Sequence, residues 1–253
     1  MNLGKVLITG ASSGIGREFA YKFSKMGYEL ILVARRREKL EETASGCERE
    51  CIIIEADLSK EDEVLRLYEE VKEFDDLEIV VNNAGFGLFG EFADTEVSRE
   101  LNMIDLNIKS VHILTKLFLS DFKRKNRGFI INVASSASFL PGPLMSTYYA
   151  TKAYVQRLTL AIAEELRREN SNVYIGAFCP GPVDTEFNDV ANVKFSIKGI
   201  SAEYAAEYAI KKALKRKILI IPGKIVKLGV FFQRFLPTKL LLRISYNIQK
   251  KKS

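Results

Sequence analysis

Residues 5–16 read KVLITGASSGIG, and this stretch decides the fold of the chain. The aliphatic and β-branched run of residues 5–9 predicts a buried strand. Residues 14–26 then carry apolar side chains at the spacing of one helix face, and Gly27 follows as a stop signal. The glycine-rich segment TGASSGIG therefore joins a strand directly to a helix.

The glycines of this segment have separate roles. Gly10 permits a tight turn, Gly14 lets the backbone come close to a diphosphate, and Gly16 allows the helix to pack near the strand. The helix N-terminus adds free N–H groups and partial positive charge. The segment therefore predicts a phosphate-binding loop, with contacts from Gly10, Ser12, Ser13, Gly14, Ile15 and Gly16.

Short apolar runs and longer helical patterns continue to alternate along the chain. Further strands are predicted at residues 29–34, 51–55, 78–82, 129–134, 172–178 and 218–221. Further helices are predicted at residues 36–44, 59–73, 95–125, 146–170 and 201–216. Ser59 is expected to cap the second of these helices, and Ser146 or Thr147 the fourth. Such alternation predicts the α/β class: a Rossmann-type doubly wound parallel β-sheet with helices on both faces.

The end of the second strand indicates the cofactor. A carboxylate there would bind the ribose 2′-hydroxyl of NAD(H). This chain has Ala34 followed by Arg35, Arg36 and Arg37, so no acid repels a 2′-phosphate and arginine donors are present to bind one. NADP(H) is therefore favoured over NAD(H), with Arg35 as the first candidate contact. Arg36 and Arg37 also fit a solvated helix start.

A tyrosine and a lysine are spaced to act together. Tyr148 and Lys152 are four residues apart near the start of a predicted helix, so they share one helix face. A lysine cation near a phenol is expected to lower the phenol pKa from about 10 towards neutrality. Such a phenol could give or take a proton near physiological pH.

Several separated segments together resemble the short-chain dehydrogenase/reductase family. They are TGASSGIG (9–16), Ala56-Asp57-Leu58, NNAG (82–85), Leu106-Asn107, Ser135 thirteen residues before Tyr148, YYATK (148–152) and PGPVDT (180–185). The resemblance covers residues 3–222, and no departure from the family pattern removes a catalytic group.

The resemblance implies how the cofactor is held. Asp57 would bond the adenine amino group, although an acid here could equally serve a turn, and Lys152 would also hold the nicotinamide ribose. Val183 and Thr185 would contact the nicotinamide carboxamide. The remaining cofactor contacts implied by the matched segments are Leu58, Asn83, Ala84, Gly85, Tyr148, Pro180 and Gly181.

It also implies the catalytic residues. Ser135 would hydrogen-bond the substrate carbonyl and is favoured over Ser136 by its spacing. Asn107 would bend its helix and anchor water in a proton relay with Lys152, and it fits better than Asn102. The expected activity is NADP(H)-dependent interconversion of a carbonyl and an alcohol. The alternatives are a non-catalytic NADP(H)-binding sensor or scaffold, and an epimerase or dehydratase on the same fold.

The substrate is expected to be a small hydrophobic or lipid-like molecule. Apolar loops follow the motifs at residues 86–89 and 139–145, and residues 183–199 could form a lid. Family members usually form dimers or tetramers, here through the helices at 95–125 and 146–170. With one histidine and three cysteines without metal-ligand spacing, no metal site is predicted.

The C-terminal part of the chain differs in charge from the rest. Residues 211–253 hold 13 basic residues and no acidic one, although the whole chain is only +6. Residues 1–222 are interpreted as the cofactor-binding and catalytic domain, and residues 223–253 as a basic, amphipathic helical extension of the same unit. The extension either packs on its own body or a second subunit, or contacts a membrane peripherally. No signal peptide, membrane span or nucleic-acid module is apparent, so a cytoplasmic protein that binds no nucleic acid is expected.

Overall fold

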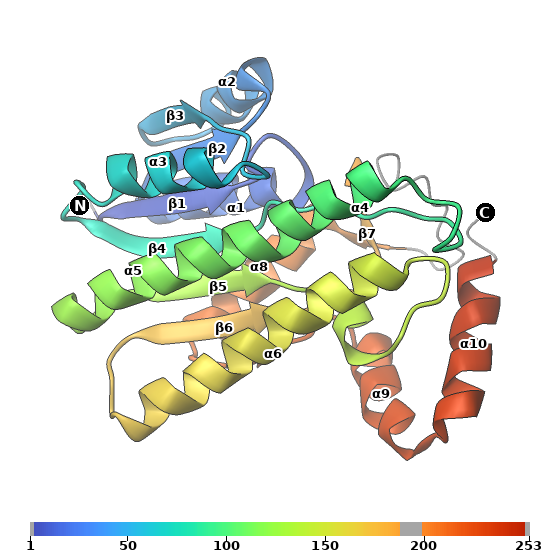
Figure 1. The fold of residues 1–253 in the computed structure, drawn as a ribbon. Helices are drawn as coiled ribbons and strands as arrows, with labels where there is room; N and C mark the ends of the chain where they lie inside the picture. Colours follow the sequence, from blue (N-terminus) through green and yellow to red (C-terminus); the bar gives the residue numbers. More distant parts are fainter. Residues whose placement is uncertain (1–2, 188–198, 251–253) are drawn as a thin grey trace.

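The structure is a computed structural model that describes residues 3–187 and 199–250. Its centre is a seven-stranded parallel sheet in the order β3-β2-β1-β4-β5-β6-β9 (Figure 1). The strands are β1 Lys5–Thr9, β2 Glu29–Ala34, β3 Cys51–Glu55, β4 Leu77–Asn82, β5 Phe129–Val133, β6 Tyr174–Phe178 and β9 Leu219–Ile220. A short separate pair is formed by β7 Val183–Asp184 and β8 Ile200–Ser201.

Helices cover both faces of the sheet. They are α1 Gly14–Met26, α2 Arg37–Ser45, α3 Glu61–Val71, α4 Val97–Ile104, α5 Val111–Lys125, α6 Ser146–Arg168 and α8 Ala202–Ala213. The apolar residues of α1, α2 and α8 pack in one core, and those of α3, α5 and α6 pack in the core on the opposite face. The expected doubly wound α/β architecture is thus confirmed.

The side chains of each central strand alternate between the two cores. In β1, Val6 and Ile8 lie in the core beneath α1, whereas Leu7 lies in the core beneath α3 and α5. Successive side chains of a strand point to opposite faces, so a strand buried on both sides must be apolar throughout. This requirement explains why continuous β-branched and aliphatic runs in the sequence predict the strands.

The strand order reverses between β1 and β4. The chain moves outward from β1 through β2 to β3, and then crosses back so that β4 pairs with the other side of β1. The loops that follow β1 and β4 therefore diverge and leave a crevice at the carboxyl ends of these strands. Figure 1 shows the loops after these strands and after β5 meeting on one side of the sheet.

Three local expectations differ from the structure. The cap of α3 is Lys60 rather than Ser59, because Ser59 donates to Asp57 in the preceding turn. The residue preceding α6 is Met145, and neither Ser146 nor Thr147 caps this helix. The long helix expected at 95–125 is interrupted by η1, a π-helical stretch over Asp105–Ser110.

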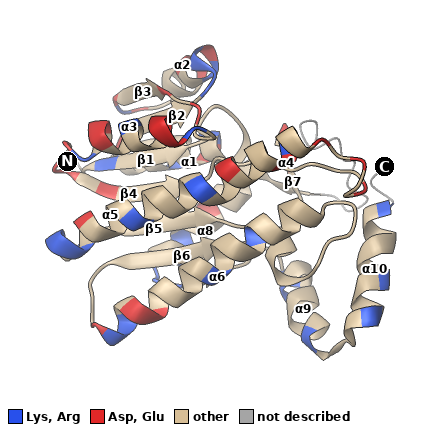
Figure 2. Cartoon of the chain, viewed as in Figure 1, with Lys and Arg blue, Asp and Glu red and all other residues tan. Residues whose placement is uncertain are grey.

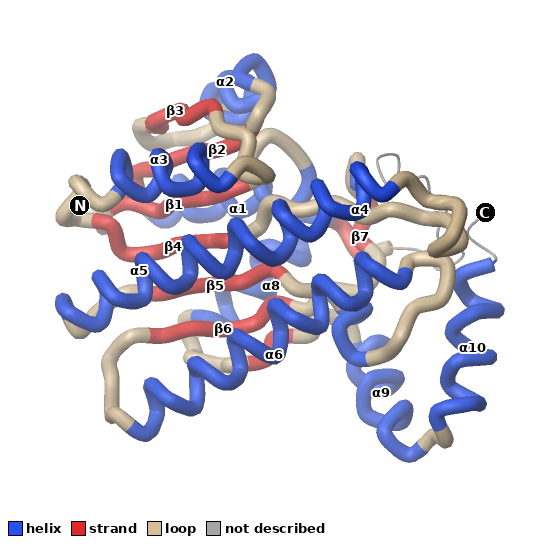
Figure 3. Tube along the Cα trace, in the orientation of Figure 1, coloured by secondary structure: helices blue, strands red, loops and turns tan. Residues whose placement is uncertain are grey.

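The C-terminal extension is helical and packs beside the sheet rather than joining it. It consists of α9 Lys224–Phe232, the 3-10 turn η3 Gln233–Phe235 and α10 Thr238–Lys250. Figure 2 shows basic and no acidic residues on both helices, and Figure 3 shows them as a hairpin at one end of the molecule. Within the described ranges, no helix is long and apolar enough to cross a membrane. Of the expected lid at 183–199, residues 188–198 lie outside the described residues.

The core beneath α5 offers a test of the packing. Phe118 is fully buried and its ring lies 5.2 Å from that of Tyr68, whereas Phe92 is 70% exposed. Phe118→Ala should lower the free energy of unfolding by about 3–5 kcal/mol through lost burial and a residual cavity. Phe92→Ala should change it by no more than about 0.5 kcal/mol. Urea titration followed by circular dichroism measures both, and equal losses would contradict this account of the core.

Candidate active site

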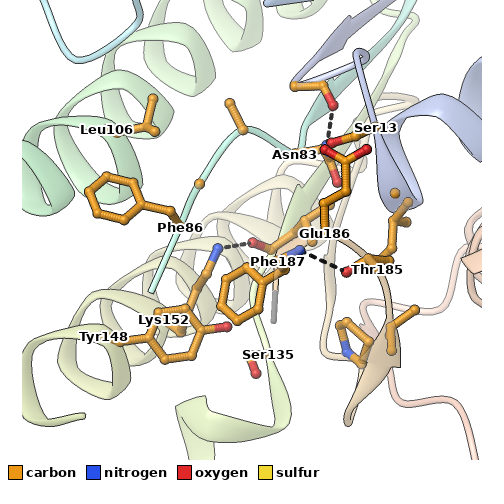
Figure 4. Close-up of a pocket in the computed structure, with 18 of the residues that line it drawn as sticks. Ser13, Asn83, Phe86, Leu106, Ser135, Tyr148, Lys152, Thr185, Glu186 and Phe187 are labelled. Atoms are coloured by element: carbon orange, nitrogen blue, oxygen red, sulfur yellow. Dashed lines mark hydrogen bonds between the residues drawn. The ribbon is translucent and has the colours of Figure 1, made fainter. Parts of the chain in front are cut away.

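One cavity of about 400 Å³ lies across the carboxyl ends of the strands (Figure 4). Almost every residue proposed from sequence lines it, from the loop after β1 to the segment after β6. The two exceptions are Gly16, which lies behind the loop, and Asn107, which lies behind Gly85. Motifs as far apart in the chain as Gly10 and Thr185 thus surround one space.

The glycine-rich loop lets backbone segments lie closer together than side chains would allow. Gly10 adopts a φ of 66°, in the left-handed region that favours glycine. A Cβ on Gly16 would lie 2.1 Å from the carbonyl oxygen of Gly10, so α1 can begin this close to the loop only with glycine there. No side chain caps the N-terminus of α1 and its first turn holds no acidic residue. An anion such as a diphosphate fits this helix end.

The loops after β1 and β4 are fixed to each other by hydrogen bonds. The hydroxyl of Thr9 accepts from the backbone N–H of Asn83 and of Ala84, each at 3.0 Å. The amide of Asn83 in turn donates to the carbonyl oxygens of Thr9 at 2.9 Å and Gly10 at 3.2 Å. This network holds the floor of the cavity at the point where the strand order reverses.

Two arginines line the cavity beyond β2. Arg35 and Arg36 both reach it, and the guanidinium of Arg36 donates to Glu186 at 3.1 Å and to the hydroxyl of Ser12 at 3.5 Å. Arg37 instead pairs with Glu41 on α2. The sequence pattern did not favour Arg36 as a cofactor contact, because its partner Glu186 lies 150 residues further along the chain.

Asp57 serves the turn after β3 as well as the cavity wall. Its carboxylate accepts from the backbone N–H of Ser59 at 3.2 Å and from its hydroxyl at 2.8 Å. Together with Leu58 it lines the cavity. The two interpretations of Asp57, as a turn residue and as a residue of the cavity wall, are therefore compatible.

Tyr148, Lys152 and Ser135 meet at the other end of the cavity. Tyr148 and Lys152 project from the first turns of α6, and in Figure 4 the phenol oxygen points to the side where Ser135 lies. The ammonium of Lys152 donates to the carbonyl oxygen of Val133 at 2.9 Å. The hydroxyl of Ser135 accepts from the backbone N–H of Ala137 at 3.1 Å, which leaves its own hydrogen available for donation.

Burial controls the protonation of this cluster. It raises the pKa of Tyr148 to about 12, which a hydrogen bond with Ser135 partly opposes. Burial also lowers the pKa of Lys152 to about 8. The expectation that the phenol pKa lies below its ordinary value is therefore wrong for this arrangement, because desolvation of the phenolate is the largest cause of the shift. The ammonium of Lys152 is directed to the carbonyl oxygen of Val133.

Asn107 is fully buried inside the π-helical stretch η1. Its amide nitrogen donates to the carbonyl of Phe86 at 2.9 Å and to the hydroxyl of Thr151 at 3.1 Å, and its oxygen accepts from the N–H of Phe86 at 3.1 Å. It therefore joins three elements: η1, the loop after β4, and α6. Asn102, the competing candidate, is only partly buried, whereas Asn107 is fully buried; neither residue lines the cavity itself.

The wall beside Tyr148 is apolar. Phe86 and Met145 line it as the loop composition predicted, and the ring of Phe187 lies 5.5 Å from that of Tyr148. Leu106 and Tyr149 also line it. Leu106 and Tyr149 lie in the matched segments 106–107 and 148–152, and Phe187 lies in the expected lid, but sequence reasoning assigned none of them to this wall. Phe139, which shared the predicted apolar loop, packs against a different core.

This geometry defines a class of protein: an α/β enzyme fold whose cavity joins a dinucleotide-binding loop to a buried phenol, ammonium and hydroxyl. The family model described as short chain dehydrogenase matches residues 4–211. The chain therefore belongs to the short-chain dehydrogenase family. It is accordingly an oxidoreductase that acts between alcohols and carbonyls with a nicotinamide cofactor.

Individual relatives agree with this placement. An uncharacterized oxidoreductase of Staphylococcus epidermidis is 34% identical, over 72% of this chain and 79% of that protein. Mouse 17-beta-hydroxysteroid dehydrogenase type 3 is 31% identical, over 83% of this chain and 67% of that protein. A solved short-chain dehydrogenase from Sphingobium yanoikuyae in complex with NADPH is 27% identical, with a TM-score of 0.83 over 92% of this chain and 94% of that chain.

Burial of Lys152 predicts a pH dependence of stability. The pKa is about 8 in the folded chain against an ordinary value of 10.5, so the unfolded chain binds more protons between these values. This group therefore makes the free energy of unfolding rise with pH across that window, by about 3 kcal/mol at most. Lys152→Met should remove this rise, whereas Lys116→Met, which replaces an exposed lysine on α5, should keep it. Urea unfolding at successive pH values measures the slopes, and an undiminished slope in Lys152→Met would show that the ammonium is not desolvated.

Proposed function

We propose that this chain is an NADP(H)-dependent oxidoreductase that interconverts a carbonyl and an alcohol on a hydrophobic substrate. The observation that carries the proposal is the meeting of Tyr148, Lys152 and Ser135 at one end of a cavity. The other end of the same cavity has the uncapped start of α1 and two arginines. A bound nicotinamide supplies the hydride, and the protein residues bind, orient and exchange the proton.

Tyr148 is the proposed proton donor to the substrate oxygen. Burial raises its pKa to about 12, so the phenol holds its proton at physiological pH and can give it to a developing alkoxide. Ser135 accepts from Ala137, so its hydroxyl hydrogen can point to the same substrate oxygen and share the charge that develops there.

Lys152 and Asn107 are proposed to support this pair. Lys152 brings a buried ammonium to the end of the cavity nearest Tyr148, where it can bind a ribose hydroxyl and stabilise the phenolate left after proton transfer. Asn107 acts as a positioning residue. It fixes the backbone at Phe86 and the hydroxyl of Thr151, which precedes Lys152 in α6.

The preference for NADP(H) rests on the segment after β2. Ala34 offers no carboxylate, and Arg35 and Arg36 line the cavity where a 2′-phosphate would need cations. Glu186 pairs with the guanidinium of Arg36 at 3.1 Å, and since both side chains are about half exposed, this weak pair can yield to a 2′-phosphate. The related dehydrogenase of known structure with NADPH adds support from outside the chain.

A hydrophobic substrate is proposed from the wall beside Tyr148. Phe86, Leu106, Met145 and Phe187 offer an apolar surface next to the phenol, which suits a bulky ketone or secondary alcohol of steroid or lipid type. The similarity to a 17-beta-hydroxysteroid dehydrogenase points in the same direction.

We further propose that residues 1–222 form the catalytic domain, with residues 223–253 as an extension of it. Assembly into a homodimer or homotetramer would use the helices α4, α5 and α6. Exposed apolar side chains on this surface, Leu101 on α4 and Tyr154 on α6, support such an assembly.

The role of Tyr148 is tested by removal of its hydroxyl. Tyr148→Phe should lower kcat for reduction of a hydrophobic ketone by about 10³-fold, because general-acid catalysis is lost. The Kd for NADPH should stay within about twofold, since the ring and its packing remain. Tyr154→Phe, a phenol on the exposed side of the same helix, should keep full activity. Nicotinamide absorbance gives the rates, and wild-type turnover by Tyr148→Phe would remove the basis of the proposal.

The cofactor preference is tested at the arginines. The double variant Arg35→Ala/Arg36→Ala should weaken binding of NADPH by about 10- to 100-fold, because charge-assisted hydrogen bonds to the 2′-phosphate are lost. Binding of NADH should change little. Arg37→Ala, which breaks only a pair with Glu41, serves as the matched control. Fluorescence titration gives the dissociation constants, and equal losses for both cofactors would contradict a 2′-phosphate contact.

A further inference from the structure

The helix α10 buries polar residues and exposes apolar ones. Its two buried residues are Ser245 and Gln249, one turn apart on the side that faces the body. Leu240, Ile244 and Ile248, which also share a stripe, are exposed. A helix that packs on a protein body in water normally has the opposite arrangement. The exposed stripe of α10 therefore fits an apolar environment outside the chain.

The helix α9 has the same feature on its outer side. Val226 and Val230 face the body and pack in the core near Val155 and Ala177. On the opposite side, Ile225, Leu228 and Phe232 follow one another at helical spacing and are 86%, 58% and 54% exposed.

These side chains are concentrated in one segment. We name residues 224–250, from the start of α9 to the end of α10, the C-terminal hairpin. Among the described residues, 21 large apolar side chains are exposed, and 11 of them lie between residues 225 and 248. Single exposed apolar residues are ordinary, but a cluster of this size marks an interaction surface.

The C-terminal hairpin is also uniformly basic. It contains six lysines and arginines and no acidic residue, and Figure 2 shows these cations along both helices. Basic residues interleaved with leucine, isoleucine and phenylalanine are the composition of helices that lie in the interface of an anionic membrane.

We infer that the C-terminal hairpin is a peripheral binding surface for an anionic phospholipid bilayer. This inference goes beyond the proposed function and does not depend on it. Two hairpins facing each other in a dimer would bring like charges together, which opposes self-association through this surface. An anionic bilayer matches both the basic charge and the exposed apolar side chains of the hairpin, since its headgroups attract the cations and its acyl region accepts the apolar side chains.

The attachment of the hairpin places this surface beside the active-site cavity. The hydroxyl of Ser245 donates to the carbonyl oxygen of Pro141 at 3.0 Å, and the amide of Gln249 donates to the hydroxyl of Tyr149. Tyr149 lines the cavity next to Tyr148. A chain bound to a bilayer through the hairpin would thus hold its cavity near the phase in which apolar molecules dissolve.

Vesicle sedimentation of the purified full-length chain tests the inference. The chain should sediment with vesicles of phosphatidylcholine and phosphatidylglycerol, and binding should fall as salt is raised or phosphatidylglycerol is omitted. Leu228→Ser/Phe232→Ser should reduce the partition coefficient on the order of tenfold or more, because interfacial burial is lost. Lys227→Gln/Lys239→Gln should reduce it about fivefold for each lysine.

Matched controls separate this effect from general surface changes. Leu65→Ser on α3 and Lys25→Gln on α1 alter an exposed leucine and an exposed lysine away from the hairpin and should bind vesicles as the wild type does. Thermal unfolding confirms that each variant folds. No binding to anionic vesicles, or equal binding by the hairpin variants, would overturn the inference. So would a hairpin-dependent dimer in sedimentation velocity without vesicle binding. No turnover is measured, so these results are independent of the proposed enzymatic activity.

Discussion

One buried amide holds the catalytic end of the cavity together. Asn107 interrupts the regular helix between α4 and α5 with a π-helical stretch, and it uses both ends of its amide on partners from elsewhere in the chain. The backbone of Phe86 and the hydroxyl of Thr151 fix the loop after β4 against α6. A fully buried amide without these bonds would cost about 1–3 kcal/mol, so the three elements must come together around it. The geometry of Tyr148 and Lys152 depends on this junction.

The fold was predictable because its signals are local. Strands buried on both faces must be continuous apolar runs, and the loops after β1 and β4 carry glycine and asparagine for reasons of backbone geometry and hydrogen bonding. The i, i+4 spacing of Tyr148 and Lys152 likewise follows from one helix alone. These features can be predicted without knowing which segments of the chain contact each other, and the structure contains all of them. The roles of the individual residues stay predictions.

The rest depended on tertiary contacts that no local pattern records. Glu186 pairs with Arg36 from across the cavity, and Phe187 and Leu106 reach the wall from separate loops and helices. Ser59 was expected to cap α3, but Asp57 competes for its hydroxyl. The pKa of Tyr148 was expected to fall, yet burial raises it to about 12. The burial of the phenol is a property of the packing between α6 and the loops around it, which no local pattern records.

The attachment of α10 explains why its outer surface matters. The side-chain oxygen of Gln249 is buried and finds no hydrogen-bond partner within the part of the chain that the structure describes. An unpaired buried oxygen costs about 1–3 kcal/mol. The contacts of α10 with the body therefore include one unfavourable polar group beside the hydrogen bonds that Ser245 and Gln249 donate. The large apolar side chains of the hairpin lie on its exposed surface. A bilayer that buries them would therefore stabilise α10 in the position from which Gln249 donates to Tyr149 at the wall of the cavity.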